Sequence, residues 1–308
     1  MRILLTGSTG QVGNALLRQL QGLGTIIAPG RDQLDLSQPK LVRQAIRDLQ
    51  PDLILNPAAY TAVDKAENEP DLANAINAES PAVMAEEAKK SGCILIHYST
   101  DYVFSGSKQD DSGNWVPYKE QDATHPVNVY GQSKLSGEQA ILQSGCRHLI
   151  FRTSWVYSLF GKNFLLTMLR LANERPELKV VNDQWGAPTS ADWLAQTTLD
   201  IVRQIQQAEK PGEWWAQHQG LYHVTPAGKT SWCGFTEEII TQASQRQMLL
   251  KDAPNILGIP SSDYPTPARR PHNSLLDTAK LTQHFSIQTP TWQAVLDSCL
   301  TSNSVRNQ

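Results

Sequence analysis

Residues 3–13 read Ile3-Leu4-Leu5-Thr6-Gly7-Ser8-Thr9-Gly10-Gln11-Val12-Gly13, and a helical run follows at 14–23. A short apolar strand, a G-x-x-G-x-x-G turn and a helix are the elements that bind a dinucleotide. Glycines let the backbone approach a pyrophosphate, and the helix N-terminus supplies amide donors and the positive end of its dipole. A tight strand-to-helix turn without a ligand is the alternative. The early position and the sequence that follows favour a dinucleotide site at Gly7, Gly10 and Gly13.

Four further apolar segments have strand character and alternate with helical patterns. The strands are expected at 25–28, 52–55, 93–98 and 149–152, and amphipathic helices at 41–49 and 71–90. This alternation predicts an α/β protein with a Rossmann-type doubly wound parallel sheet. We expect residues 1–158 to form the nucleotide-binding domain, joined by a helix at 190–208. Residues 159–308 then form mainly a smaller, sequence-interleaved α/β substrate domain.

The composition excludes several classes of partner. The chain has 308 residues and a net charge of −3, which argues against a nucleic-acid or anionic-membrane surface. Its four cysteines, at positions 93, 146, 233 and 299, lie far apart without metal-ligand spacing, so we expect free thiols in the cytoplasm and no metal cluster. The N-terminal apolar run is too short for a signal peptide. Because no run of about 18 apolar residues occurs, we expect no membrane span.

The end of the second expected strand carries information about the cofactor. An acid usually stands there to select NAD, but here Arg31 follows Pro29-Gly30. An arginine at this position can pair with a 2′-phosphate, which favours NADPH and leaves NADH open as the second choice. A solvated surface arginine is the alternative. Asp35 and Leu36 then form the turn where an adenine edge is expected.

A candidate proton donor lies at Tyr130-Gly131-Gln132-Ser133-Lys134. On a helix, positions i and i+4 share one face, so the phenol and the ammonium lean the same way. A cation beside a phenol lowers the pKa of the phenol from about 10, and such a pair can give a proton to a carbonyl as a hydride arrives. Thr100 follows a middle strand and can bind the same carbonyl oxygen. Alone, the Tyr-x-x-x-Lys pattern also occurs on many solvated helix faces.

These motifs together resemble the extended short-chain dehydrogenase/reductases, and more narrowly the dTDP-4-dehydrorhamnose reductase family. The resemblance spans nearly the whole chain and is carried by residues 7–13, 56–67, 99–104, 130–134, 152–157, 182–189 and 264–274. The stretch Asn56-Pro-Ala-Ala-Tyr-Thr-Ala-Val-Asp-Lys-Ala-Glu67 is the most specific of them, because it is not a general dehydrogenase feature.

The resemblance implies an NAD(P)H-dependent oxidoreductase that reduces the C4 keto group of dTDP-4-dehydro-L-rhamnose, the last step of dTDP-L-rhamnose biosynthesis. It implies that Tyr130 protonates the forming alkoxide, that Lys134 lowers the Tyr130 pKa and holds the nicotinamide ribose, and that Thr100 binds the reacting oxygen. The implied cofactor contacts are Gly10, Gln11, Val12, Arg31, Asp35, Leu36, Ala58, Ala59, Tyr60, Tyr130 and Lys134. The implied sugar contacts are Val63, Thr100, Asp101, Tyr130 and Trp155.

The chain departs from the family at a metal site. Some members hold a magnesium ion at a dimer interface through acidic side chains, one of them in the helix after the glycine turn. Here that helix begins Asn14-Ala15-Leu16-Leu17 and offers no carboxylate. Asp192 alone is a poor site for a cation that needs several oxygens. We therefore do not expect a metal-bridged dimer, and we expect a monomer or a weak homodimer.

The second half holds one further candidate site. A proline-rich segment at 263–271 carries Arg269 and Arg270, and paired arginines suit a diphosphate. We hypothesise that they bind the substrate pyrophosphate; a surface loop that closes the domain is the alternative. Residues 210–219, with Trp214-Trp215, are expected to form a polar loop.

Two other functions remain open. A nucleotide-sugar epimerase or dehydratase of the same superfamily also uses Tyr-x-x-x-Lys, but it keeps NAD bound and recycles it. Dehydratases typically add acid and base residues beside the middle-strand threonine, whereas here Asp101 is followed by Tyr102. A non-catalytic regulatory subunit of methionine adenosyltransferase also resembles this family. The intact Tyr130, Lys134 and Thr100 favour an enzyme.

Overall fold

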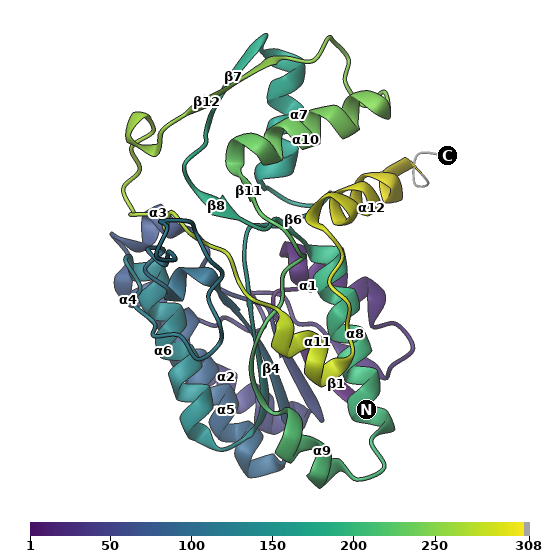
Figure 1. The fold of residues 1–308 in the computed structure, drawn as a ribbon. Coiled ribbons are helices and arrows are strands. Elements are labelled where there is room, and N and C mark those ends of the chain that lie inside the picture. Colours follow the sequence, from purple (N-terminus) through teal and green to yellow (C-terminus); the bar gives the residue numbers. More distant parts are fainter. Residues whose placement is uncertain (305–308) are drawn as a thin grey trace.

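The central element of the computed structural model, which describes residues 1–304, is a six-stranded parallel sheet. Its strand order is β10-β5-β4-β3-β1-β2 (Figure 1). The strands are β1 (Arg2–Leu5), β2 (Thr25–Ile27), β3 (Leu53–Asn56), β4 (Ile94–Thr100), β5 (Arg147–Thr153) and β10 (Gly220–His223). The order reverses between β1 and β3, which is the point where open α/β sheets bind ligands. The predicted doubly wound parallel sheet is confirmed.

Alternating side chains of each strand supply the two faces of this sheet. Ile3 and Leu5 pack with the core that holds α1 (Gln11–Gln19) and α8 (Ala191–Gln207). Leu4, between them, packs with the opposite core. That second core is covered by α2 (Pro39–Leu49), α5 (Ser80–Ser91) and α6 (Val129–Ser144), which lie on the other side of the sheet in Figure 1. Since both faces are covered, the strands read as continuous apolar runs.

The helix expected at 71–90 contains an irregular turn. It is built from α4 (Pro70–Asn74), a π-helical turn (Ala75–Glu79) and α5. The turn contains the buried Asn77, which donates from Nδ2 to the Tyr60 carbonyl (3.1 Å) and accepts from the Tyr60 amide at Oδ1 (2.8 Å). A π-bulge at such a position is commonly functional. Here it fixes the backbone of the segment after β3.

Residues 210–219 form a helix, so the predicted polar loop is wrong. Helix α9 (Pro211–His218) starts with a proline. The first helical turn tolerates proline, which lacks a backbone N–H, because an N–H at this position would have no partner within the helix. Trp215 is buried in the core with Tyr222 and Phe285. The burial of this large apolar side chain outweighs the polar character of the segment. The helix α11 (Ala279–Phe285) closes the same end of the sheet.

A smaller group of elements, drawn at the top of Figure 1, packs around its own core. It contains α7 (Phe164–Glu174), α10 (Trp232–Gln245) and α12 (Trp292–Ser304), with β7 (Glu177–Val181) paired in parallel with β12 (Asn255–Ile259). Two short strand pairs lie between this group and the large sheet (Figure 1). They are β6 (Val156–Tyr157) with β9 (Thr189–Ser190), and β8 (Trp185–Gly186) with β11 (Thr230–Ser231). The domain boundary at residue 158 stays a prediction.

Among residues 1–304, no helix combines the length and apolar character that crossing a bilayer requires.

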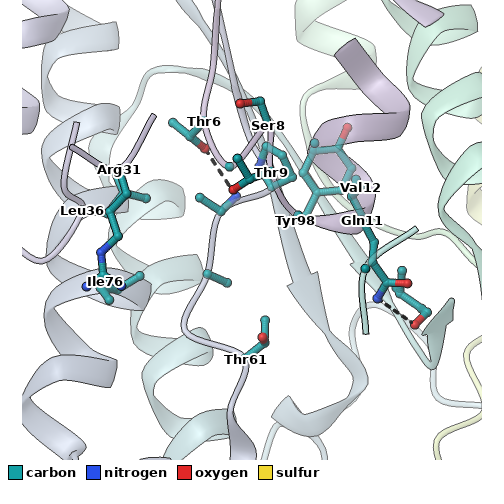
Figure 2. A pocket seen from close by; sticks show the side chains of 18 of the residues that line it. Thr6, Ser8, Thr9, Gln11, Val12, Arg31, Leu36, Thr61, Ile76 and Tyr98 are labelled. Carbon is teal, nitrogen blue, oxygen red and sulfur yellow. Dashed lines mark hydrogen bonds between the residues drawn. The ribbon is translucent and has the colours of Figure 1, made fainter. Parts of the chain in front are cut away.

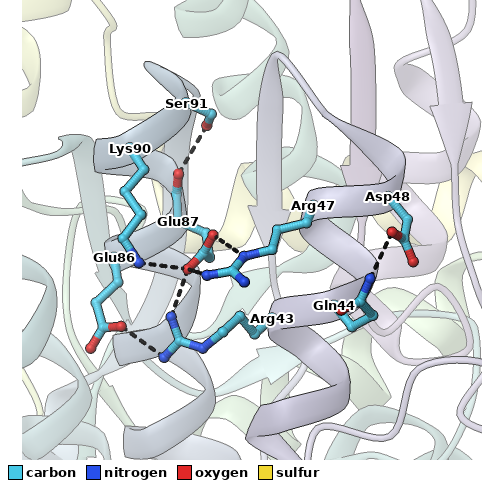
Figure 3. Close-up of polar contacts among 8 residues, drawn as sticks. All are labelled: Arg43, Gln44, Arg47, Asp48, Glu86, Glu87, Lys90 and Ser91. Atoms are coloured by element: carbon cyan, nitrogen blue, oxygen red, sulfur yellow. Dashed lines mark hydrogen bonds and ion pairs between the residues drawn. The ribbon is translucent and has the colours of Figure 1, made fainter.

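An ion-pair network joins α2 to α5 on the sheet's outer layer (Figure 3). The Glu87 carboxylate is buried and accepts from Arg43 (2.6 Å), Arg47 (2.8 Å) and Lys90 (2.9 Å). The Arg47 hydrogen bond is the largest cause that lowers the pKa of Glu87 to about 2, although burial opposes it. A network on one buried carboxylate stabilises more than isolated surface pairs do.

We predict that Glu87→Gln lowers the free energy of unfolding by about 1–3 kcal/mol at pH 7, because three cations lose the negative charge and one oxygen of their shared acceptor. The folded pKa lies below the reference value of 4.5, so the stabilisation is present above that pH and is lost as the pH falls toward 2. Urea unfolding from pH 7 to pH 2.5 should therefore show the variant and the parent converging. In the control Glu174→Gln, which removes an exposed pair with Arg170, the loss should stay below about 0.5 kcal/mol. Equal losses in the two variants would contradict the prediction.

Candidate active site

A cavity of about 490 Å³ lies beyond the C-terminal ends of β1, β3 and β4, at the reversal of strand order. Its size is within the range of small-molecule and cofactor sites. Figure 2 shows Arg31, Leu36 and Ile76 at one end and Gln11 at the other. Every predicted cofactor contact except Tyr60 lines it, namely Gly7, Gly10, Gln11, Val12, Gly13, Arg31, Asp35, Leu36, Ala58, Ala59, Tyr130 and Lys134.

The glycine turn is packed too closely for any side chain at Gly13. A Cβ there would stand 2.0 Å from the Gly7 carbonyl oxygen, so a larger residue would force the turn open. The Gly10 amide donates to the same oxygen (2.9 Å), which closes the turn directly before α1. The helix N-terminus therefore points its free amides at the cavity floor. These residues fit a dinucleotide pyrophosphate.

Arg31 lies at the open end of the cavity. Its side chain is 76% exposed and its Nε is 3.7 Å from Asp35 Oδ1. The amide of Ser37 donates to Asp35 (2.9 Å), and this bond is the main cause that lowers the pKa of Asp35. Since Asp35 is anionic, it holds Arg31 loosely beside the cavity and leaves most of the guanidinium available. The arrangement suits a phosphate on a dinucleotide ribose.

Tyr60 is the one predicted cofactor residue that does not line the cavity. Its phenol donates to Glu69 (2.5 Å), while its backbone is held by Asn77. The predicted cofactor contact of Tyr60 stays a prediction, because both its phenol and its backbone groups have other partners.

Tyr130 is positioned by the start of α6. Asn128 caps this helix by accepting from the Gly131 amide (2.7 Å). A Cβ on Gly131 would stand 2.2 Å from the Tyr102 carbonyl, so the glycine allows α6 to touch the turn that follows β4. That contact places Tyr130 near Thr100, which acts to lower the pKa of the Tyr130 phenol. The predicted role of Thr100, to bind the reacting carbonyl oxygen beside Tyr130, stays a prediction.

The predicted lowering of the Tyr130 pKa is wrong for the protein without cofactor. Burial raises the pKa of Tyr130 to about 12, and the hydrogen bond with Thr100 offsets only part of this effect. The phenol is thus neutral and carries its proton at physiological pH. Lys134 does not reverse the shift; its Nζ donates to the Tyr98 carbonyl (2.6 Å) and lies 3.1 Å from His97 Nε2.

The predicted sugar contacts, apart from Tyr130, lie outside the cofactor cavity. Thr100 donates to Asp101 Oδ1 (3.2 Å), and burial raises the pKa of the Asp101 carboxyl to about 7. Val63 begins the short helix α3 (Val63–Ala66). Trp155 has a left-handed backbone (φ 49°) and stacks on Trp232 at 3.6 Å between ring centroids. Because an L-residue rarely adopts this conformation, the packing must hold Trp155 in place.

The two arginines of the proline-rich segment differ in their partners. Arg270 forms a two-fold hydrogen-bonded pair with Asp64 (2.9 Å for both bonds) and so ties the segment to α3. The Arg269 side chain is exposed, and its carbonyl accepts from Asn128. Arg270 is therefore already neutralised, and only Arg269 keeps an accessible guanidinium for a diphosphate.

The residues at the family's metal position do not suit magnesium. Arg18 donates to Asp192 Oδ1 (2.5 Å) and to Asn14 Oδ1 (2.9 Å), so a guanidinium takes the oxygens that a cation would need. Within residues 1–304, no three His, Cys, Asp or Glu side chains gather in a way that could hold a metal ion.

Sequence and structure comparisons agree with this geometry. The family model described as the RmlD substrate binding domain matches residues 1–305. The chain is 45% identical to the dTDP-4-dehydrorhamnose reductase of Burkholderia thailandensis over 304 residues, with 97% of this chain and 98% of that protein covered. The chain belongs to the dTDP-4-dehydrorhamnose reductase family. The predicted class, an NAD(P)H-dependent oxidoreductase, is confirmed.

Two other relatives support the same family assignment. The enzyme of this name from Escherichia coli K12 is 47% identical over 298 residues, which cover 95% of each chain. The crystal structure of the Bacillus anthracis dTDP-4-dehydrorhamnose reductase in complex with NADP superposes with a TM-score of 0.85 and 32% identity, covering 98% of this chain and 99% of that one. The predicted cofactor type therefore agrees with a family structure.

Several residues that line the cavity were not predicted from the sequence. The ends of β4 and β5 contribute Tyr98, Ser99 and Thr153, and their place at the carboxyl ends of adjacent strands is the signal that could have found them. Buried His97 contacts Lys134 and buried Asn56 contacts His97, and no sequence motif marks either contact.

We predict that Arg31→Ala weakens NADPH binding by about tenfold or more and leaves NADH binding nearly unchanged, because only NADPH carries the 2′-phosphate. Fluorescence titration with each dinucleotide measures both constants. Arg175→Ala, at an exposed position outside the cavity, is the matched control and should change neither. If Arg31→Ala weakened both dinucleotides equally, 2′-phosphate recognition by Arg31 would be excluded.

Proposed function

We propose that the protein reduces the C4 keto group of dTDP-4-dehydro-L-rhamnose to give dTDP-L-rhamnose, with Tyr130 as the proton donor. The observation that carries the proposal is that Tyr130 and Lys134 line one cavity together with the glycine turn, and that Thr100 is near enough to Tyr130 to lower the pKa of its phenol. When bound, NADPH supplies the hydride. Family membership at 45% identity supports the substrate.

The protons on the hydroxyl groups of Tyr130 and Thr100 suit a reduction. The phenol is neutral because its pKa is raised to about 12, so it holds a proton to give as negative charge develops on the substrate oxygen. Thr100 has one hydroxyl proton, which now goes to Asp101. Once Tyr130 has given its proton away, the same hydroxyl can turn to the phenolate and stabilise it. Thr100 therefore lowers the basicity of the phenolate that the proton transfer leaves behind.

The binding roles follow from position. The cofactor roles of residues such as Gly10, Arg31 and Ala58 are proposed from their lining of the cavity. Val63, Asp101 and Trp155 are proposed sugar contacts from the family motif. We place the reaction in the cytoplasm, because the four cysteines are free and buried, which fits a reducing compartment.

A monomer or weak homodimer is proposed because Arg18, rather than a shared metal, pairs with Asp192.

A spectrophotometric assay with the keto-sugar separates this function from its alternatives. Stoichiometric oxidation of NADPH, with a competent epimerase supplied to form the L-sugar, is the expected result. Turnover without net oxidation would point instead to an epimerase, and cofactor binding without turnover to a regulatory subunit. No oxidation of either NADPH or NADH would refute the proposal.

We predict that Tyr130→Phe lowers kcat by a factor of about 100 or more while the dissociation constant for NADPH changes little, because only the donated proton is lost. Tyr102→Phe is a suitable control: its ring packs edge-on against Tyr130 at 5.6 Å, but it does not line the cavity. The steady-state rate and a direct NADPH titration measure the two effects. A Tyr130→Phe enzyme with near-normal kcat would exclude Tyr130 as the donor.

We predict that Arg269→Ala raises KM for the nucleotide sugar with little change in kcat, because an accessible guanidinium pairs with the diphosphate away from the reacting carbon. Lys251→Ala, another exposed cation, is the control. Steady-state kinetics at saturating NADPH give both parameters. An unchanged KM in Arg269→Ala would remove the diphosphate hypothesis.

A further inference from the structure

A chain of buried hydrogen bonds runs behind the cavity from β1 to α6. Thr6 Oγ1 donates to Asn56 Oδ1 (2.6 Å), Asn56 Nδ2 contacts His97 Nδ1 (3.0 Å), and His97 Nε2 contacts Lys134 Nζ (3.1 Å). The four side chains lie on β1's end, β3, β4 and α6, and none is more than 2% exposed. None of the roles assigned above uses Asn56 or His97.

The direction of each bond can be worked out from the Thr6 end. The Ala58 amide donates to Thr6 Oγ1 (3.3 Å), so the Thr6 hydroxyl is free to give its own proton to Asn56 Oδ1. Asn56 then presents its amide Nδ2, which can only donate, to His97. His97 Nδ1 must accept. A neutral imidazole that accepts at Nδ1 carries its proton on Nε2.

That assignment has a consequence for Lys134. The His97 Nε2 proton points at Lys134 Nζ, and an ammonium has only donors. The contact at 3.1 Å is therefore a hydrogen bond only if the amine is neutral and accepts from His97. Lys134 still donates to the Tyr98 carbonyl (2.6 Å), which a neutral amine can do with either of its own protons.

The surrounding charges permit a neutral amine. Three elements supply the titratable and polar groups around Lys134. Its own helix, α6, carries Glu138 and Tyr130. Strand β4 carries His97 and the Tyr98 carbonyl, and β5 carries Arg152. The Glu138 carboxylate is already held by Arg152 through two bonds (2.8 and 2.6 Å). Burial lowers the pKa of Lys134 to about 8, with Glu138 opposing the shift, and it lowers the pKa of His97 well below its usual value. His97 is therefore neutral at physiological pH, and the neutral amine of Lys134 costs much less free energy than in an exposed lysine.

We propose that His97 is a positioning residue that acts through Lys134: fixed by Asn56 with its proton on Nε2, it donates to the Lys134 amine and favours the neutral form of that amine in the cofactor-free protein. Since Thr6 and Ala58 line the cofactor cavity, the chain connects that cavity directly to Lys134. The kinetic consequence rests on the proposed function, in which Lys134 acts as an ammonium beside Tyr130. The tautomer of His97 is independent of that function.

The first test reads the tautomer without any sugar substrate. In ¹⁵N-histidine NMR of the cofactor-free wild-type protein, with His97 assigned through its backbone neighbours, Nε2 should have the shift and attached proton of a protonated nitrogen, and Nδ1 that of an unprotonated acceptor. This pattern should persist from pH 6 to pH 8. A proton on Nδ1, or an imidazolium, would overturn the proposal even if the enzyme reduces its substrate as expected.

The second test uses the sign of a pH shift. In His97→Asn, the shorter asparagine side chain reaches only the place of the His97 Nδ1 atom. Asn56 therefore keeps a hydrogen-bond partner, while Lys134 loses the Nε2–H donor that favours its neutral form. The alkaline limb of the kcat/KM profile should therefore move up by about one pH unit. If His97 instead accepted from an ammonium, the same substitution would move the limb down. A downward shift, or none, would overturn the proposal.

The control is another buried histidine in the same sheet. His148 on β5 is 4% exposed, and its Nδ1 contacts the Cys146 carbonyl rather than any residue of the site. His148→Asn is expected to lower the Tm but leave the pH profile where it is. A His97→Asn variant that lost Tm to the same degree and kept the wild-type profile would show that His97 only packs the sheet. The NMR measurement decides the question if His97→Asn does not fold.

Discussion

The active-site geometry depends on one close backbone contact, between Gly131 of α6 and the Tyr102 carbonyl after β4. Because that position has no side chain, α6 can approach the sheet edge closely enough for Tyr130 to meet Thr100. The same helix carries Lys134 one turn later, where it contacts β4 through Tyr98 and His97. A methyl group at this contact would move the proton donor and the lysine away from the sheet together.

Burial, rather than the neighbouring charge, sets the proton state of the site. It raises the pKa of Tyr130 and lowers that of Lys134, so both groups tend toward their neutral forms before any ligand arrives. Two charged pairs are compensated internally, Glu138 with Arg152 and Asp64 with Arg270. A site of this kind can respond strongly to the charges that a dinucleotide and a diphosphate bring with them.

Local patterns were sufficient where a few residues determine the outcome. The glycine turn and the alternating apolar strands predict the sheet, and the Tyr-x-x-x-Lys spacing predicts a shared helix face; all three depend on short-range geometry. The helix at 211–218 was missed because Trp215 is buried in a core that includes Phe285, seventy residues away in the chain. The partners of Lys134 and Arg270 were missed for the same reason, since a side chain's hydrogen bonds follow from tertiary contacts that no motif records.

The edge strand β10 has a consequence for how the chain is made. It pairs with β5 although some seventy residues, including α7 and α8, separate the two strands. During synthesis from the N-terminus, the sheet keeps β5 as an open edge until residue 223 has left the ribosome, and α11 covers that end only later. Nascent chains stalled before β10 would expose an unpaired strand, which is a surface that chaperones and other strands can bind.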